Sequence, residues 1–189
     1  MKKRRRVFIA INLPKDIINE LASYQKKWPE LPARWTIKEN LHITLSFLGY
    51  LTDTEMGEIC LAAKEVAGRH KSFELVLNKI SYGPFNKKTK RMVWANGEKS
   101  KELSILKRDL ENSFSERINF LPERRSLLPH INLARLKTLE WRSIDPEERL
   151  DINETVDLSF FVESIEVMES VLKRTGPIYT IVESYNLAT

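Results

Sequence analysis

The sequence predicts an α+β protein with largely antiparallel sheets. Short β-branched or alternating runs recur along the 189-residue chain, and helical segments separate only some of them. A parallel α/β sheet would require a regular alternation of strands and helices, which is absent. Neither G-x-x-x-x-G-K nor G-x-G-x-x-G occurs, so the two common glycine-rich phosphate loops are excluded as well.

The first elements follow from local composition. Residues 7–12 (VFIAIN) are apolar and β-branched, which predicts a strand. Pro14 and Asp16 suit the first turn of a helix that reaches about residue 27. Residues 28–40 contain an aromatic residue and two prolines close together, and they predict a loop.

Residues 41–47 (LHITLSF) alternate strictly between apolar and polar side chains. Successive side chains of a strand point to opposite faces, so this pattern predicts a half-buried strand. The core side is expected to carry Leu41, Ile43, Leu45 and Phe47. The polar side is expected to carry His42, Thr44 and Ser46.

Capping residues and apolar spacing predict the remaining elements. Thr52 begins a helix by N-cap chemistry, and Gly68 ends it after about residue 67. A second helix over 99–115 has one apolar stripe, made of Leu103, Leu106, Leu110 and Phe114. Strands are expected over 73–80, 90–95, 129–134, 158–168 and 178–185. The linker-like residues 142–154 are too few to separate independent domains, so we expect one domain over 1–189.

The composition, with 42% hydrophobic and 30% charged residues, excludes a disordered or collagenous chain, and no apolar run is long enough to span a membrane. The net charge of +5 comes from 31 basic and 26 acidic residues, and residues 2–6 supply five of the basic ones. The basic character therefore belongs mainly to an N-terminal arm over 1–6. The apolar stretch 7–11 is too short for a signal peptide. Cys60 is the only cysteine, so we expect no disulfide and a cytoplasmic location.

Two of the three histidines share one local pattern. His42-Ile43-Thr44-Leu45 and His130-Ile131-Asn132-Leu133 both read His, apolar, polar, Leu. Positions i and i+2 of a strand share a face, so each motif sets an imidazole beside a short hydrogen-bonding side chain. Two such strands facing each other would place two imidazoles around one small anion.

This pair suits acid–base chemistry on a phosphate. Near neutral pH one imidazole can accept a proton while the other donates one. A structural role for the two histidines is the competing interpretation from pattern alone. A zinc site would need a third ligand that neither motif supplies, and no G-x-S-x-G nucleophile motif occurs. His70, in a polar segment, is expected to be a solvated residue.

The two histidine motifs and the residues around them resemble those of the 2H phosphoesterases, and most closely those of the RNA 2′,3′-cyclic phosphodiesterases often labelled 2′-5′ RNA ligases. The resemblance rests on residues 6–14, on 40–49 with the first histidine motif, on 129–135 with the second, and on a closing segment that includes Glu169-Ser170, Gly176-Pro177 and Tyr179. It implies a bilobal fold with pseudo-two-fold symmetry, in which two largely antiparallel sheets line a central cleft and helices lie outside. Asn132 departs from the Thr or Ser that is usual in the second motif.

The resemblance also implies the activity. Such an enzyme opens the 2′,3′-cyclic phosphate at an RNA 3′ end to a 2′-phosphate, without metal or other cofactor, and the resemblance also implies a reversible 2′-5′ RNA ligase activity. His42 would be the general acid and His130 the general base, although the near-symmetric pattern allows the reverse. Thr44 and Asn132 would hold phosphate oxygens, and Arg135 would neutralise the phosphate. Strict alternation turns Arg135 to the opposite face, so this last role requires a bulge.

Two other functions stay open. One is an RNA-end-binding module whose catalysis is weakened by Asn132. The other is the same chemistry on 2′-5′ oligonucleotides or small cyclic nucleotides. In each case we expect a monomer with no membrane contact. The aromatic residues Phe8, Tyr82, Phe85 and Trp94 and the basic runs 2–6 and 87–91 are candidates for RNA contact, with core packing and solvated turns as the alternatives.

Overall fold

The computed structural model describes residues 4–84, 90–123, 127–174 and 176–189. Its strands are β1 (Arg4–Asn12), β2 (Ala33–Trp35), β3 (His42–Thr52), β4 (Phe73–Gly83), β5 (Met92–Gly97), β6 (His130–Leu136), β7 (Asn153–Val162), β8 (Ser164–Lys173) and β9 (Gly176–Asn186). Its helices are α1 (Lys15–Tyr24), α2 (Asp53–Ala67), α3 (Lys101–Arg117) and α4 (Thr138–Ser143), with short 3-10 turns at Gln25–Lys27 and Lys38–Asn40.

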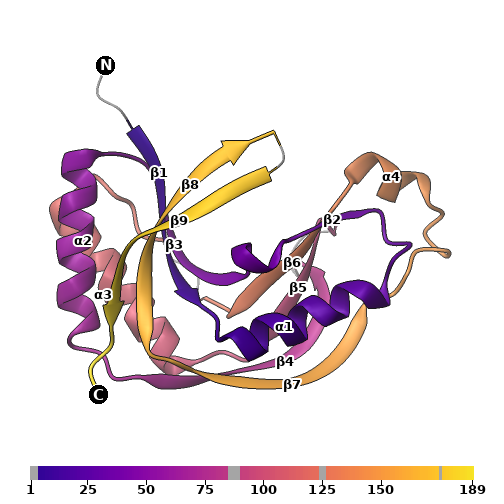
Figure 1. Cartoon of the computed structure of the whole chain (residues 1–189), viewed down its shortest axis with the longest axis horizontal. Coiled ribbons are helices and arrows are strands. Elements are labelled where there is room, and N and C mark those ends of the chain that lie inside the picture. The colour runs from indigo at the N-terminus through magenta and orange to yellow at the C-terminus, as the bar shows by residue number, and fades with distance from the viewer. Residues whose placement is uncertain (1–3, 85–89, 124–126, 175) are drawn as a thin grey trace.

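The strands form one antiparallel sheet made of two halves. The order is β7-β4-β5-β6-β3-β1-β8-β9, with β2 paired to β6. The halves join only between β3 and β6, where a single residue pair, Ile43 with Ile131, is in register. One half contains β3, β1, β8 and β9, and the other contains β7, β4, β5, β6 and the short β2; all pairs are antiparallel, which confirms the predicted α+β class. The two expected sheets thus touch through one pair in the middle of the molecule (Figure 1).

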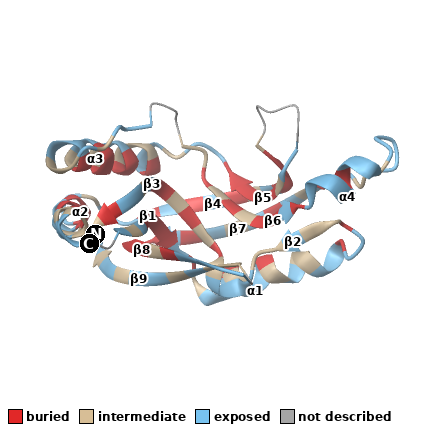
Figure 2. Ribbon diagram, turned by 90° about the horizontal axis from the view of Figure 1, so that it is seen from above, coloured by how far each residue is buried: buried red, intermediate tan, exposed pale blue. Residues whose placement is uncertain are grey.

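The helices cover one side of this sheet. α2 and α3 lie side by side against the half that contains β1 and β3, while α1 lies against the other half (Figures 1 and 2). A large core cluster includes buried side chains from these helices and from both halves of the sheet. Phe8, Ala10 and Met168 form a separate small cluster with Tyr179. The opposite face of the sheet, which carries His42 and His130, is called the histidine face below.

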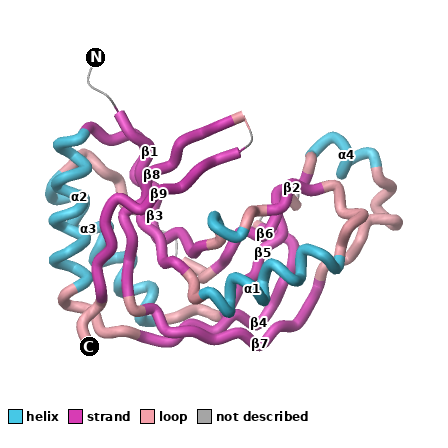
Figure 3. The backbone as a smooth tube through the Cα atoms, viewed as in Figure 1, coloured by secondary structure: helices cyan, strands magenta, loops and turns pink. Residues whose placement is uncertain are grey.

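Several local predictions are confirmed. Thr52 caps α2 through a capping box with Glu55, and the helix ends at Gly68. The predicted stripe of α3 is fully buried, and it consists of Leu103, Leu106, Leu110 and Phe114. Figure 3 draws loops and turns in pink, and most of these connections between helices and strands are short.

Other predictions are corrected. The expected loop over 28–40 contains strand β2. The expected strand over 158–168 is two strands, β7 and β8, separated at Glu163. The sequence does not mark this boundary with a glycine or proline, since only Glu163 and Ser164 lie between Val162 and Ile165. Arg4–Arg6 belong to strand β1, so this part of the expected arm is paired sheet. Residues 1–3, Phe85 and residues 87–89 lie outside the described residues.

Phe47 is not in the core, contrary to its predicted place in the alternation. Ile9 pairs with Ser46, whereas Ala10 pairs with Thr44, so Leu45 is an extra residue on β3. Such a β-bulge shifts the alternation by one position. Ser46 consequently turns inward and is 5% exposed, and Phe47 turns outward and is 67% exposed.

Candidate active site

The two histidine motifs meet at the one residue pair that joins the halves of the sheet. Ile43 and Ile131 are the second residues of the two motifs, and both are fully buried in the main core. Extending this antiparallel register by one residue sets His42 across from Asn132 and Thr44 across from His130. Neighbouring strands lie about 4.8 Å apart, so the four polar side chains surround one small area of the histidine face.

Both imidazoles are held in the same way. His42 Nδ1 lies 2.8 Å from the carbonyl oxygen of Asn40, and His130 Nδ1 lies 2.8 Å from that of Leu128. A carbonyl only accepts, so Nδ1 carries the proton in each ring and donates it to the backbone. The neutral imidazole therefore presents an unprotonated Nε2. In His42 this nitrogen lies 3.0 Å from Thr44 Oγ1, whose hydroxyl can donate to it.

The environment of His42 favours its neutral form. Burial lowers the pKa of His42 below its ordinary value of 6.5, and the nearby His130 lowers it further. The bond to the Asn40 carbonyl opposes part of this effect. The electrostatic influence of His130 on His42 also supports the proximity that the strand register requires. At neutral pH the site thus holds a deprotonated His42.

Aromatic rings flank both histidines. The His42 ring centroid lies 5.1 Å from that of Phe8 and 5.2 Å from that of Tyr179, with Tyr179 edge-on. The His130 centroid lies 4.2 Å from that of Trp94. Gly83 leaves room for the indole, since a Cβ there would collide with the Trp94 ring. Together these rings limit the orientations available to each imidazole.

A β-bulge on β6 determines the face of the sheet on which Arg135 lies. Val93 pairs with Ala134 and Trp94 pairs with Asn132, so Leu133 is an extra residue on β6. The shift returns Arg135 to the face of His130 and leaves it exposed, as the expected phosphate-binding role requires. Burial raises the pKa of the Tyr179 hydroxyl, while the positive charges of Arg6 and Arg135 lower it. Arg135 therefore acts electrostatically on a ring that contacts His42.

Asn132 has an unsatisfied amide oxygen. Its Oδ1 is buried and has no hydrogen-bond partner in the described part of the chain. A buried polar atom without a partner is costly, and such atoms are typical of sites that await a ligand. Its position across from His42 makes the Asn132 side chain a candidate contact for a bound phosphate or sugar hydroxyl.

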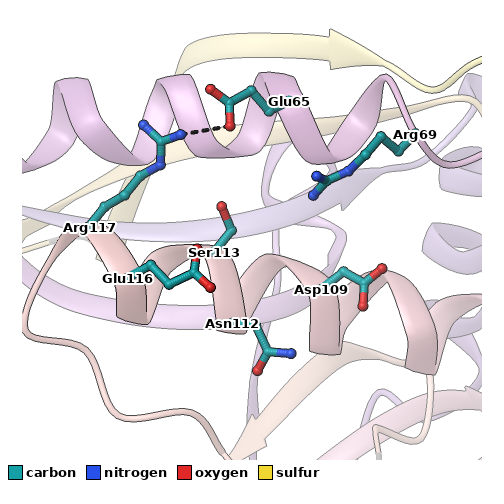
Figure 4. Close-up of a pocket in the computed structure, with 7 residues that line it drawn as sticks. All are labelled: Glu65, Arg69, Asp109, Asn112, Ser113, Glu116 and Arg117. Carbon is teal, nitrogen blue, oxygen red and sulfur yellow. Dashed lines mark hydrogen bonds and ion pairs between the residues drawn. The ribbon is translucent and has the colours of Figure 1, made fainter.

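Two pockets lie away from the histidines. One is a polar groove of about 240 Å³ between α2 and α3, lined by both acidic and basic side chains (Figure 4). The other, of about 380 Å³, lies beside α4 and includes Tyr82 and Trp141. His70 is not simply solvated as predicted, because its Nε2 pairs with Asp109 Oδ2 at 3.0 Å. Within the described ranges no group of three or more His, Cys, Asp or Glu side chains could hold a metal ion.

The four motif residues were predicted from the sequence, but the aromatic rings that contact the two histidines were only partly predicted. Tyr179 entered only through the resemblance, and its contact with His42 depends on the pairing of β8 with both β1 and β9. Trp94 was a candidate for RNA contact, whereas in the structure its ring packs against His130. Tyr82 is buried, and its hydroxyl donates to the Leu150 carbonyl at 2.7 Å, as its core interpretation requires.

Comparison with known proteins places this site in a family. The family model described as LigT like phosphoesterase matches residues 11–94, which include the first histidine motif. A curated relative from Aeropyrum pernix, named RNA 2′,3′-cyclic phosphodiesterase, is 30% identical over 153 residues, covering 79% of this chain and 83% of the relative. The chain belongs to the LigT-like phosphoesterase family. Another relative of the same name, from Methanocaldococcus jannaschii, is 27% identical and covers 95% of this chain and 99% of its own.

Solved structures show that the LigT-like fold extends over nearly the whole chain. The crystal structure of TT0787 of Thermus thermophilus has a TM-score of 0.82 at 26% identity, covering 96% of this chain and 97% of that one. E. coli LigT in complex with 3′-AMP has a TM-score of 0.78 at 24% identity and covers 99% of this chain. The agreement includes both halves of the sheet, so the family fold continues beyond the matched residues 11–94.

Proposed function

We propose that this protein is an RNA 2′,3′-cyclic phosphodiesterase that opens cyclic phosphate ends to 2′-phosphates by acid–base catalysis with two histidines. The observation that carries the proposal is the Ile43–Ile131 pair, whose register gathers both histidine motifs on one face. The names of the curated relatives support the same substrate class. Cyclic nucleotides share the reacting group and belong to the same proposal.

The reaction requires one proton to be removed and one to be supplied. A base takes a proton from water, whose oxygen attacks phosphorus as the bond from phosphorus to O3′ breaks. An acid protonates O3′, and the phosphate stays on O2′. Thr44, Asn132 and Arg135 are proposed to bind the non-bridging oxygens, where negative charge accumulates in the transition state.

The lowered pKa of His42 supports the reverse of the roles first expected from the sequence, an arrangement that the near-symmetric motifs allow. A deprotonated Nε2 suits the general base, so His42 is proposed to activate water and His130 to protonate O3′. Both rings fix Nδ1 on a backbone carbonyl, so each acts through Nε2. In 2′-5′ ligation a 5′-hydroxyl would attack phosphorus in place of water, with the same base removing its proton and the same acid protonating O3′.

The function is tested with a short RNA that ends in a 2′,3′-cyclic phosphate, in excess EDTA. We expect hydrolysis, with a 2′-phosphate as the product, because two imidazoles can supply both proton transfers. Chromatography against 2′- and 3′-phosphate standards identifies the isomer. Tight binding of the RNA end without product would favour the binding module, and Asn132→Thr would then be the next variant to assay. Activity that disappears in EDTA would contradict the proposed mechanism.

The role of His42 predicts a pH dependence. A general base acts in its deprotonated form, so kcat/KM should fall with decreasing pH only below 6.5, the ordinary value from which the pKa of His42 is lowered. The measurement uses a cyclic mononucleotide over a range of pH. The His42→Ala variant should lack this decline on the acid side, and a variant that keeps it would contradict the role of His42 as the base.

A substrate with sulfur in place of O3′ separates the two roles directly. A thiolate leaves without a proton, so the variant that lacks the general acid should regain activity on it. We expect this rescue for His130→Ala and not for His42→Ala. Rescue of His42→Ala alone would restore the roles expected from the sequence.

A further inference from the structure

Two large aromatic side chains are exposed on the histidine face outside the proposed site. Phe47 is 67% exposed and Tyr50 is 61% exposed, and both belong to β3, the strand that begins with His42. The ring centroid of Phe47 lies 6.1 Å from that of Phe8, which in turn contacts His42. Exposed apolar side chains that gather in one patch mark a contact with a ligand or partner, whereas scattered ones are ordinary.

The strand register shows that these rings continue the line of the site. Directly paired residues of antiparallel strands share a face. Along β1 and β3 the pairs on the histidine face are Asn12 with His42, Ala10 with Thr44, Phe8 with Phe47 and Arg6 with Tyr50. The first and last pairs lie six positions apart along β1, which is roughly 20 Å of strand. The surface therefore extends from the reacting group along β1 and β3.

Positive charge continues along the same face. Arg4 pairs with Thr52 and Arg6 with Tyr50, and both arginines are exposed. Arg5 points to the other side, where its guanidinium forms ion pairs with Asp53 at 3.1 Å and Glu169 at 3.4 Å. Among the described residues, neither Arg4 nor Arg6 has such a carboxylate partner. Alternation along β1 thus places Arg5, whose charge is neutralised, on one face. It places Arg4 and Arg6, which can bind an anion, on the histidine face.

We propose that Phe47, Tyr50, Arg4 and Arg6, together called the β1–β3 track, bind the single-stranded RNA that leads to the cyclic phosphate end. Exposed rings stack on bases whatever their sequence, and neighbouring arginines neutralise phosphates. The inference rests on the proposed function and adds to it a substrate preference. The enzyme acts on oligonucleotide ends better than on cyclic mononucleotides, because only a longer chain reaches the track.

The test compares kcat/KM for a cyclic mononucleotide with that for a hexanucleotide ending in a 2′,3′-cyclic phosphate. Phe47→Leu and Tyr50→Leu should each lower the value for the hexanucleotide by about tenfold, the effect of losing one base stack. The value for the mononucleotide should stay unchanged, since it does not extend to these rings. Phe161→Leu is the matched control, because Phe161 is 60% exposed on β7, at the far edge of the sheet from β3.

The arginines are tested through salt dependence. Arg4→Gln/Arg6→Gln should reduce the slope of log Kd against log salt concentration by about 1.4 for a hexanucleotide with a 2′-phosphate end, which is about 0.7 for each phosphate that is no longer neutralised. Lys64→Gln/Lys101→Gln removes the same charge from exposed positions on α2 and α3 and should leave the slope unchanged.

The outcomes separate this inference from the proposed function. A wild-type protein that hydrolyses neither substrate would overturn the function itself. Hydrolysis of both substrates with equal efficiency, or track variants that change both values alike, would overturn only the track. Aromatic variants that alter the oligomeric state in sedimentation, without a selective loss on the hexanucleotide, would assign the rings to contact between protein copies and also overturn the track.

Discussion

Replacing His42 or His130 with alanine is expected to lower kcat for opening a 2′,3′-cyclic phosphate by about 10²–10⁴-fold. Each replacement removes one of the two proton transfers while leaving the phosphate contacts in place. The two groups act in one transition state, so the double variant should lose little more than either single variant. Initial rates with a cyclic mononucleotide measure the effect without any contribution from the β1–β3 track.

The third histidine supplies the control. His70 is paired with Asp109 between the end of α2 and α3, away from the histidine face, so His70→Ala should keep wild-type turnover. Circular dichroism and thermal unfolding of all three variants check that the fold is retained. Near-wild-type turnover by a folded His42→Ala or His130→Ala protein would contradict the two-histidine mechanism.

The fold class and the four motif residues could be predicted from the sequence because both depend on patterns among residues that are close along the chain. Alternation in residues 41–47 and the repeated His-apolar-polar-Leu motif determine which side chains share a strand face. The pattern could not predict that β3 pairs with β6, because this pairing is a long-range contact between Ile43 and Ile131. The resemblance to the 2H phosphoesterases supplied the expectation that the two motifs meet.

Strict alternation fails at Phe47 and at Arg135 for one physical reason, a β-bulge in each strand. Alternation after His42 predicted that Phe47 is buried, and alternation after His130 predicted that Arg135 turns away. Both strands insert one residue at the Leu that ends the motif, so the burial patterns of residues 42–47 and 130–135 are identical. A bulge depends on how the neighbouring strand pairs, and a single strand's sequence does not reveal that pairing. The two motifs therefore share their local backbone as well as their residues.

Replacing Glu111 with alanine is expected to destabilise the protein by about 3–5 kcal/mol. Lys107 Nζ lies 2.6 Å from Glu111 Oε1, and the two side chains are only 6% and 4% exposed. Ser46 Oγ, next to the bulge of β3, donates to the same carboxylate oxygen at 3.0 Å. Removing the carboxylate leaves a buried ammonium without its counter-charge and the Ser46 hydroxyl without its acceptor. Urea unfolding at neutral pH gives the change in the free energy of unfolding.

Two further variants separate the buried charge from the lost packing. Lys107→Met/Glu111→Leu removes both charges and keeps the apolar volume, so it should lose much less stability than Glu111→Ala. Glu65→Ala removes the partner of an exposed ion pair, with Arg117 Nη2 at 2.6 Å, and should not measurably change stability. A Glu111→Ala protein as stable as Glu65→Ala would show that Lys107 finds water or another acceptor. The bulge that presents Phe47 would then be held by the sheet pairing alone, without the ion pair beneath it.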